Sequence, residues 1–476
     1  MRFLIKNAAV VTMNPIIGDF SRANILVEDE QIVGVGPNIT ASDAEVIDAS
    51  SMIAMPGMVD THRHTWQTGL RGILADGNIP DYLRGFRIQM AERYRPEDMY
   101  AGNYLGGLDA INSGVTTIVD YCHNLLTLEH AHASVNGLRD SGVRALYGHG
   151  MVPVTTNTWA EDKGRADRGP NAGDFDTRAS WARAIKSEYF SSDDQLLRMG
   201  IAPQELAIAP ASEVSLEFEL ARELGARITF HANQVLVPRL FKDVEVLHSR
   251  GLLGDDLLLV HCTFNTADEW KMLDDTGTTI SVCAESEMQM GMGFPVIKEA
   301  TDHTPGPSLG IDCTSSTGAD MISHARLVLQ VSRWHADQPS YDSKHMPTEM
   351  KWKTRDALEW LTVNGARAAG VDDSVGTLTV GKRADIVLLD MSGISQAGWN
   401  RRDPGAAIIA QTNSGNVDTV FINGVVVKRH GKLVHVDAAA AMKTLHESTD
   451  YLWKQMDENG GFVPQPPVEL PSLDRE

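Results

Sequence analysis

The stretch Met55-Pro-Gly-Met-Val-Asp-Thr-His-Arg-His64 joins a short apolar run to two histidines spaced two residues apart. Side chains on a strand alternate between its two faces, so His62 and His64 at a strand end point to the same side. Two imidazoles on one side can bind the same metal ion. The stretch therefore predicts half of a metal site at a strand end, although an isolated pair of this kind is equally typical of two surface histidines.

Three later apolar runs also end in a side chain that binds metals. His231 ends Ala-Arg-Ile-Thr-Phe, His261 ends Leu-Leu-Leu-Val, and Asp312 ends Ser-Leu-Gly-Ile. Neutral imidazoles together with a carboxylate suit Zn²⁺, Fe²⁺, Co²⁺ or Mn²⁺. Most of the 16 histidines in the chain are expected to be ordinary core or loop residues. Four strand ends that each offer a ligand favour one shared metal site.

Apolar runs typical of strands alternate with helical patterns between residues 58 and 370, which predicts β/α units and a parallel sheet. Functional residues of a β/α barrel lie at the carboxyl ends of its strands, where these ligand candidates lie. The polar segment 155–176 is expected to be a loop over those ends. Eight runs predict a closed α/β barrel of the TIM-like (β/α)8 type, with strands at 58–62, 115–121, 143–149, 206–209, 227–231, 256–261, 278–282 and 308–311.

The two ends of the chain contain short strands but too few residues for two separate cores. We expect residues 1–55 and 373–436 to form together one small composite β-sandwich, beside a barrel of residues 56–372. Residues 437–476 are expected to form a C-terminal helix, from about 438 to 457, and a proline-rich tail.

The composition indicates an ordinary globular protein, and the small-molecule substrate that we expect follows from the family resemblance given below. Hydrophobic residues make up 42% of the chain and charged residues 22%, which are ordinary values. The net charge of −21 repels phosphate backbones, so nucleic acid is not an expected partner. Neither a membrane span nor a signal peptide is recognisable. The four cysteines are expected as buried reduced thiols, which is typical of a cytoplasmic protein. We expect no membrane partner. We also expect a homo-oligomer.

These motifs resemble those of the amidohydrolase superfamily, in its branch of cytosine, guanine and adenosine-type deaminases and triazine hydrolases. The resemblance covers nearly the whole chain and implies a metal-dependent hydrolase with a (β/α)8 barrel and a composite β-sandwich. The stretches that carry it are Pro56 to His64, Ser113-Gly-Val-Thr-Thr117, His231-Ala-Asn-Gln234, Val260-His-Cys262, Leu309-Gly-Ile-Asp312 and Gly376 to Asp385.

The resemblance also implies roles for the candidate residues. One divalent metal ion, with zinc as the first choice and iron, cobalt or manganese as alternatives, would be held by His62, His64, His231 and Asp312. Binuclear relatives usually have a bridging lysine or glutamate at the fourth strand, and the run 206–211 offers neither. Asp312 would accept the proton of the activated water and pass it to the leaving nitrogen, while His261 would polarise the scissile centre.

The chain departs from this family at two positions. Deaminases of the branch have glutamate where this chain has Gln234, and a glutamine cannot pass a proton to a ring nitrogen. Relatives often show Cys-Pro-x-Ser-Asn after the seventh strand, where this chain has Cys283-Ala-Glu-Ser-Glu287. Glu285 or Glu287 either replaces the missing proton donor or is a solvated loop carboxylate.

Loss of the glutamate favours hydrolysis of an amide, urea or carbamate C–N bond in a neutral small molecule. The first alternative is a hydrolytic deaminase or dechlorinase of a purine, pyrimidine or triazine, and the second is a metal-free scaffold with the same fold. The residues expected to contact the substrate are Trp66, Gln67, Gln234 and Glu287.

Overall fold

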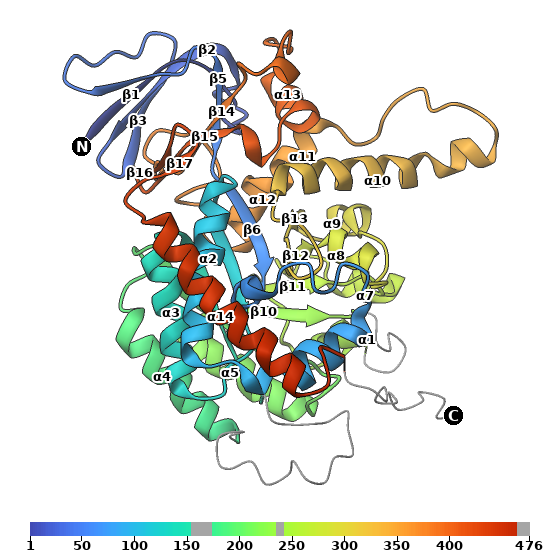
Figure 1. Cartoon of the computed structure of the whole chain (residues 1–476). Helices are drawn as coiled ribbons and strands as arrows, with labels where there is room; N and C mark the ends of the chain where they lie inside the picture. The colour runs from blue at the N-terminus through green and yellow to red at the C-terminus, as the bar shows by residue number, and fades with distance from the viewer. Residues whose placement is uncertain (154–173, 235–241, 464–476) are drawn as a thin grey trace.

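The computed structural model describes residues 1–153, 174–234 and 242–463 (Figure 1). Its centre is a sheet of eight parallel strands that follow one another in chain order. The first and the last predicted strands, at 58–62 and 308–311, lie next to each other where the sheet closes. The eight strands are β6 (Met58–Arg63), β7 (Val115–Cys122), β8 (Arg144–Gly150), β9 (Leu197–Ala202), β10 (Arg227–Ala232), β11 (Leu257–His261), β12 (Thr279–Val282) and β13 (Pro307–Leu309).

The sheet closes where the residues after β13 meet β6. The backbone amide of Asp312 donates to the carbonyl of His62 at 2.8 Å, and the amide of His64 donates to the carbonyl of Asp312 at 2.7 Å. The chains approach so closely that a Cβ atom at Gly310 would lie 2.8 Å from the Cβ of His62, which explains the glycine at this position. The predicted (β/α)8 barrel is confirmed.

Helices cover the outer surface of the barrel (Figure 1). Three short helices follow β6. They are the 3-10 helix η1 (Thr65–Leu70), the α-helix α1 (Ile79–Tyr82) and the π-helix η2 (Leu83–Met90). The remaining helices of the barrel region are α2 (Pro96–Asn112), α3 (Leu128–Ser141), α4 (Phe175–Tyr189), α5 (Ala211–Glu223), α6 (Asp243–Ser249), α7 (Ala267–Met272), α8 (Ala284–Gln289), α9 (Ile297–His303), α10 (Met321–Asp342), α11 (Thr354–Leu361) and α12 (Val363–Ala368).

The prediction of the fourth strand at 206–209 is wrong. The strand is β9, and residues 206–208 lie in the turn after it. Arg198 and Gly200 interrupt the apolar pattern of β9, and both have tertiary reasons: Arg198 donates to the carbonyl of Gly370 at 2.8 Å, and a Cβ at Gly200 would lie 3.2 Å from the side chain of Leu146. Contacts with residues distant in the sequence therefore account for the polar and small residues in β9. The local sequence pattern alone does not show that this segment is a strand.

The two ends of the chain form a second sheet, as predicted. Its N-terminal and C-terminal parts join where β5 pairs with β14 in antiparallel fashion, with Met55 opposite Val387. Ile5 and Phe421 point into the core of this sheet, whereas Met55 and Val387 point into the main core. The nine strands are β1 (Arg2–Val10), β2 (Phe20–Glu28), β3 (Gln31–Gly36), β4 (Glu45–Asp48), β5 (Met52–Pro56), β14 (Ile386–Asp390), β15 (Val417–Ile422), β16 (Val425–Arg429) and β17 (Lys432–Leu433).

The predicted C-terminal helix is α14 (Ala438–Glu458), which follows α13 (Pro404–Gln411) and the last strands. It crosses the barrel beside α2 (Figure 1). The hydroxyl of Thr449 on α14 donates to the carbonyl of Gly69 in η1 at 2.9 Å, so this helix braces the segment that follows the first barrel strand. The predicted proline-rich tail and most of the loop predicted at 155–176 lie outside the described residues, and the exact domain boundaries stay a prediction.

All four cysteines are buried and form no disulfide, as expected. In the described part of the chain, none of the helices combines the length and the apolar character that crossing a membrane requires.

Candidate metal centre

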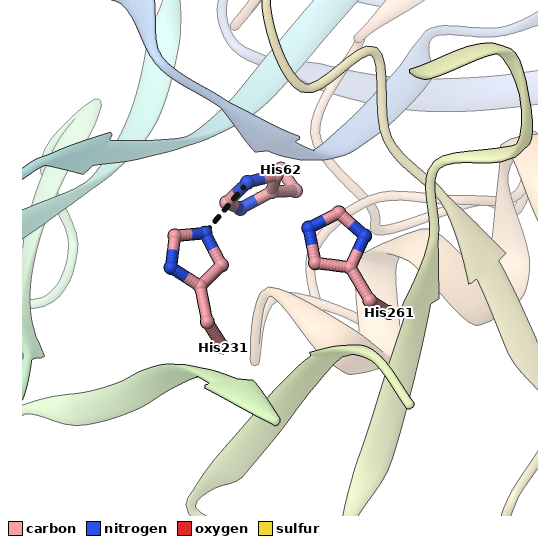
Figure 2. A group of neighbouring side chains, drawn as sticks. All are labelled: His62, His231 and His261. Carbon is pink, nitrogen blue, oxygen red and sulfur yellow. Dashed lines mark hydrogen bonds between the residues drawn. The ribbon is translucent and has the colours of Figure 1, made fainter. Parts of the chain in front are cut away.

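The ligand candidates from four separate strand ends meet at one point of the barrel mouth. Figure 2 shows His62, His231 and His261 pointing toward one another. The Nε2 atoms of His62 and His231 are 3.2 Å apart. The Oδ1 atom of Asp312 lies 3.4 Å from the Nε2 of His62 and 3.3 Å from the Nε2 of His64. These side chains are almost completely buried. Their candidate donor atoms form two groups that share His62, one with His64 and Asp312 and the other with His231 and His261, so the four expected ligands lie in the same part of the barrel mouth.

Hydrogen bonds from the opposite ring nitrogens determine which nitrogens face this point. The Nδ1–H of His64 donates to the carbonyl of Tyr121, and the Nδ1–H of His231 donates to Oε1 of Glu205, each at 3.0 Å. A neutral imidazole has one donor and one acceptor nitrogen. The Nε2 atoms of His64 and His231 therefore present lone pairs, and the tautomers follow from these partners.

The donor set fits a divalent cation. The lone pair of His64 Nε2 faces the carboxylate of Asp312, and two such acceptors repel each other unless a proton or a cation lies between them. Burial, together with the charge of His62, lowers the pKa of His64 to about 3, so a proton is not retained there at neutral pH. Burial raises the pKa of Asp312, but the hydrogen bond with His62 and the neighbouring imidazoles outweigh it and hold the pKa below its usual value. A metal ion satisfies all these atoms at once.

The backbone at two of the strand ends is held in the left-handed region. The φ angle is 75° at His261 and 66° at Asp312, a backbone conformation that residues other than glycine rarely adopt. Such conformations cost about 1–3 kcal/mol each and persist where the surrounding structure enforces them. At Asp312 the enforcement comes from the two backbone hydrogen bonds that close the barrel.

Glu205 is a site residue that the sequence analysis missed. It follows β9, and its Oε1 accepts the hydrogen bond from His231 that fixes the tautomer. Its neighbour Gln204 is anchored by Glu217, which accepts hydrogen bonds from the backbone amide and from the Nε2 of Gln204, both at 2.8 Å. The prediction that no carboxylate follows the fourth strand is therefore wrong, because it relied on the run 206–211. The correct strand end, Ala-Pro-Gln-Glu after β9, shows the signal.

His123 and Arg87 were missed as well. His123 directly follows β7, its ring centroid lies 4.3 Å from that of His64, and its Nε2 lies 3.3 Å from the hydroxyl of Tyr82. The strand-end rule that finds the other histidines also applies to His123. Arg87 lies in η2, in an irregular segment for which no comparable local signal exists.

A cavity opens at this centre, and the space in it and in the open solvent at its mouth amounts to about 470 Å³. Gln234 lines it, as expected for a residue that contacts the substrate. The described residues that line it are His64, Ile79, Tyr82, Leu83, Arg87, His123, Glu205, His231, Gln234, His261, Met290, Met292 and Asp312.

The other three residues expected to contact the substrate lie one layer behind this lining. Trp66 packs on Tyr94, with ring centroids 4.8 Å apart, and its Nε1–H donates to Nδ1 of His123 at 3.4 Å. The Nε2–H of Gln67 donates to the hydroxyl of Tyr82 at 2.9 Å. The sequence predicts both residues in the pocket because they closely follow His64, but η1 turns them into the core. They support the residues that line the cavity.

Glu287 also lies behind the lining and is no solvated loop carboxylate. It is completely buried, and its Oε1 accepts hydrogen bonds from Nδ1 of His261 at 3.2 Å and from the backbone amide of Cys283 at 2.8 Å. Burial raises the pKa of Glu287, and it also raises the pKa of Glu285, to about 7. Glu287 therefore orients His261 so that its Nε2 remains available to the cavity.

The model of the amidohydrolase family matches residues 53–427 of this chain. The chain is 25% identical to a 5'-deoxyadenosine deaminase of Methanosarcina barkeri over 457 residues, which are 94% of this chain and 98% of that protein. It is 26% identical to a 5-methylthioadenosine/S-adenosylhomocysteine deaminase of Moorella thermoacetica over 463 residues, or 94% and 99% of the two chains.

Solved structures show the same fold. An adenosine deaminase from Xanthomonas campestris with bound zinc superimposes with a TM-score of 0.81 and 22% identity, covering 94% of this chain and 98% of the other. An atrazine chlorohydrolase from Arthrobacter aurescens complexed with zinc gives a TM-score of 0.81 and 20% identity, covering 94% and 100%. At these identities the structural likeness establishes the architecture only.

Proposed function

Because this chain belongs to the amidohydrolase family, we propose that it hydrolyses a bond between carbon and a nitrogen leaving group in a small nitrogen heterocycle, with the help of one divalent metal ion. One observation carries the metal dependence: the Nε2 lone pairs of His64 and His231 and the carboxylate of Asp312 face the same part of the barrel mouth, while the Nδ1 atoms of both histidines are already hydrogen-bonded. This complete donor set argues against a metal-free scaffold.

His62, His64, His231 and Asp312 would hold the ion, and zinc is our first choice because two similar structures contain it. Such an ion would supply a water whose pKa is lowered toward neutrality. The carboxylate of Asp312 would accept a proton and pass it to the leaving nitrogen. His261 presents its Nε2 to the substrate, because its Nδ1 is held by Glu287.

The names of the relatives support a heterocyclic substrate, since they act on adenosine-type nucleosides or on a triazine. The cavity agrees with this class. Its apolar walls include Leu83, Met290 and Met292, and the rings of Tyr82 and His123 lie beside the metal centre, an environment that suits a flat, partly apolar ring.

Gln234 favours a second candidate, the hydrolysis of an amide, urea or carbamate. It lines the cavity at the position where related deaminases have a glutamate, and an amide cannot protonate a ring nitrogen. An exocyclic amide or carbamate needs no such protonation, because an activated water and a protonated leaving nitrogen are sufficient.

The test is a substrate screen on zinc-loaded protein. Ammonia or amine release is measured on purine nucleosides, aminopyrimidines and aminotriazines, and in parallel on amides, ureas and carbamates. Asp312→Asn, which keeps the size of the side chain, is the matched control. Turnover of heterocycles alone supports the first function, and turnover of acyclic compounds alone supports the second. A protein that binds no metal, or that hydrolyses neither class when loaded, refutes both. Light scattering on the same sample checks the predicted homo-oligomer.

A further inference from the structure

Arg87 brings a positive charge to the wall of the cavity, and its guanidinium forms an ion pair but no hydrogen bond among the described residues. Its side chain is 17% exposed, and the nearest carboxylate oxygen, Oε1 of Glu205, lies 3.9 Å from Nη1 of Arg87. This distance is too long for a hydrogen bond. A guanidinium group has five N–H donors and needs acceptors when it is removed from bulk water.

The two carboxylates that line the cavity are already engaged. Glu205 accepts the hydrogen bond from His231, and Asp312 belongs to the ligand set. Arg144 provides a contrast, because its buried guanidinium donates two hydrogen bonds to Asp385, at 3.1 and 3.0 Å. Arg87 has no such fork-to-fork pair in the described part of the chain, and its donors are therefore available to a ligand.

The charge of Arg87 lies at the wall of the same cavity that His64, His231 and Asp312 line. A divalent ion and Arg87 together carry three positive charges, against one negative charge each on Asp312 and Glu205. The lining of the loaded cavity thus keeps an excess of one positive charge. A glutamate in place of Gln234 would cancel this excess positive charge, whereas the neutral glutamine leaves it unchanged.

We propose that Arg87 binds an anionic group of the substrate, so that the enzyme acts on a small acid that carries a carboxylate on the same molecule as the scissile C–N bond. Arginine suits this role because its planar fork matches a carboxylate with two parallel hydrogen bonds. The inference rests on the proposed function, since it defines the substrate class of the same site.

The experiment uses pairs of probes that differ only in their charge. One pair is 2-aminopyrimidine-5-carboxylate and its carboxamide, and the other is N-carbamoylglycine and N-carbamoylglycinamide. Binding to the zinc-loaded wild type and to Arg87→Met is measured by calorimetry, and turnover is measured separately. Methionine keeps the length and apolar stem of arginine but removes the charge. Arg84→Met is the matched control, because Arg84 lies in the same helix, pairs with Asp81 and is outside the lining.

The wild type and Arg84→Met should bind at least one acid about 10- to 100-fold more tightly than its amide, the range expected for a charged hydrogen-bonded pair. Arg87→Met should lose this preference, and Arg87→Lys should keep part of it. Three results would overturn the proposal: no acid binds the wild type at millimolar concentration, the acid and the amide bind equally, or the preference survives in Arg87→Met.

A purely structural role for Arg87 would appear as an equal loss of affinity for acid and amide, and this also counts against the proposal. The two levels of inference can fail separately. If C–N bonds are hydrolysed without preference for the acid, the proposed function stands and the anion site falls. If acids bind through Arg87 and no probe or screened compound is hydrolysed, the anion site stands and the proposed function falls.

Discussion

Replacing Glu205 by glutamine should weaken metal binding and leave the barrel folded. The Oε1 of Glu205 accepts a hydrogen bond from His231 at 3.0 Å, and this bond keeps the His231 Nε2 free for the metal. Glutamine has almost the same size but carries no charge, so the imidazole becomes a weaker ligand. Loss of such a partner typically lowers metal affinity about 10- to 100-fold, which corresponds to about 1.4 to 2.8 kcal/mol.

Arg87 adds a second effect to this variant. Its guanidinium lies 3.9 Å from Glu205, so removal of the carboxylate leaves a positive charge near the metal without compensation. The double variant Glu205→Gln/Arg87→Met should therefore bind metal more tightly than Glu205→Gln alone. The difference from additivity measures the electrostatic coupling between Arg87 and the metal centre.

The assay is a competition for zinc between the metal-free protein and a chelator of known affinity, combined with a thermal unfolding curve for each variant. Glu223→Gln is the control, because Glu223 forms an exposed pair with Arg183, does not line the cavity and should leave the zinc affinity unchanged. Equal zinc affinities of the wild type and Glu205→Gln would show that the bond to His231 does not tune the ligand.

The remaining predictions concern catalysis and pH. Asp312→Asn should lower kcat by about 10²- to 10⁴-fold or more, since it removes both a metal ligand and the proton acceptor, and His261→Ala should cost less; near-normal turnover of the first variant would exclude Asp312 as the base. Gln234→Ala should reduce activity modestly, by about 0.5 to 1.5 kcal/mol of lost hydrogen bonding, if the substrate is an amide or carbamate, whereas Gln234→Glu should accelerate deamination if the substrate is a heterocycle; steady-state rates of both variants on one substrate of each class decide between them. Burial raises the pKa of Glu217 from 4.5 to about 7, so the folded state binds this proton more tightly than the unfolded state does. The resulting contribution to the free energy of unfolding is complete below pH 4.5 and is lost as the pH rises through 7. Denaturant titrations at several pH values should show this decline, and it should be smaller in Glu217→Gln; an identical pH dependence of the two proteins would assign the decline to other groups.

Local rules were sufficient to bring the candidate metal ligands to one rim of the barrel, while the choice of His62, His64, His231 and Asp312 among them came from the family resemblance. Strand side chains alternate strictly, so the His-x-His pair at the end of β6 had to point to one side. Parallel strands in a barrel end at one rim, so His231 and Asp312 had to lie near that pair once the strands were recognised. The same reasoning would have found His123, which directly follows β7, had it been applied to every strand end.

Only the tertiary structure identified the residues that surround these ligands. Arg198 and Gly200 interrupt the apolar pattern of β9, because they contact Gly370 and Leu146. The sequence therefore predicts the fourth strand at the wrong residues, and its pattern does not place Glu205 at a strand end. Arg87 lies in an irregular helix, and no periodic sequence pattern predicts where its side chain points. Glu287 is a buried hydrogen-bond partner of His261 and not a solvated loop carboxylate. The sequence by itself determined which side chains reach the barrel mouth, because strand alternation is a local property. What those side chains touch depends on segments far apart in the chain, whose packing no local pattern encodes.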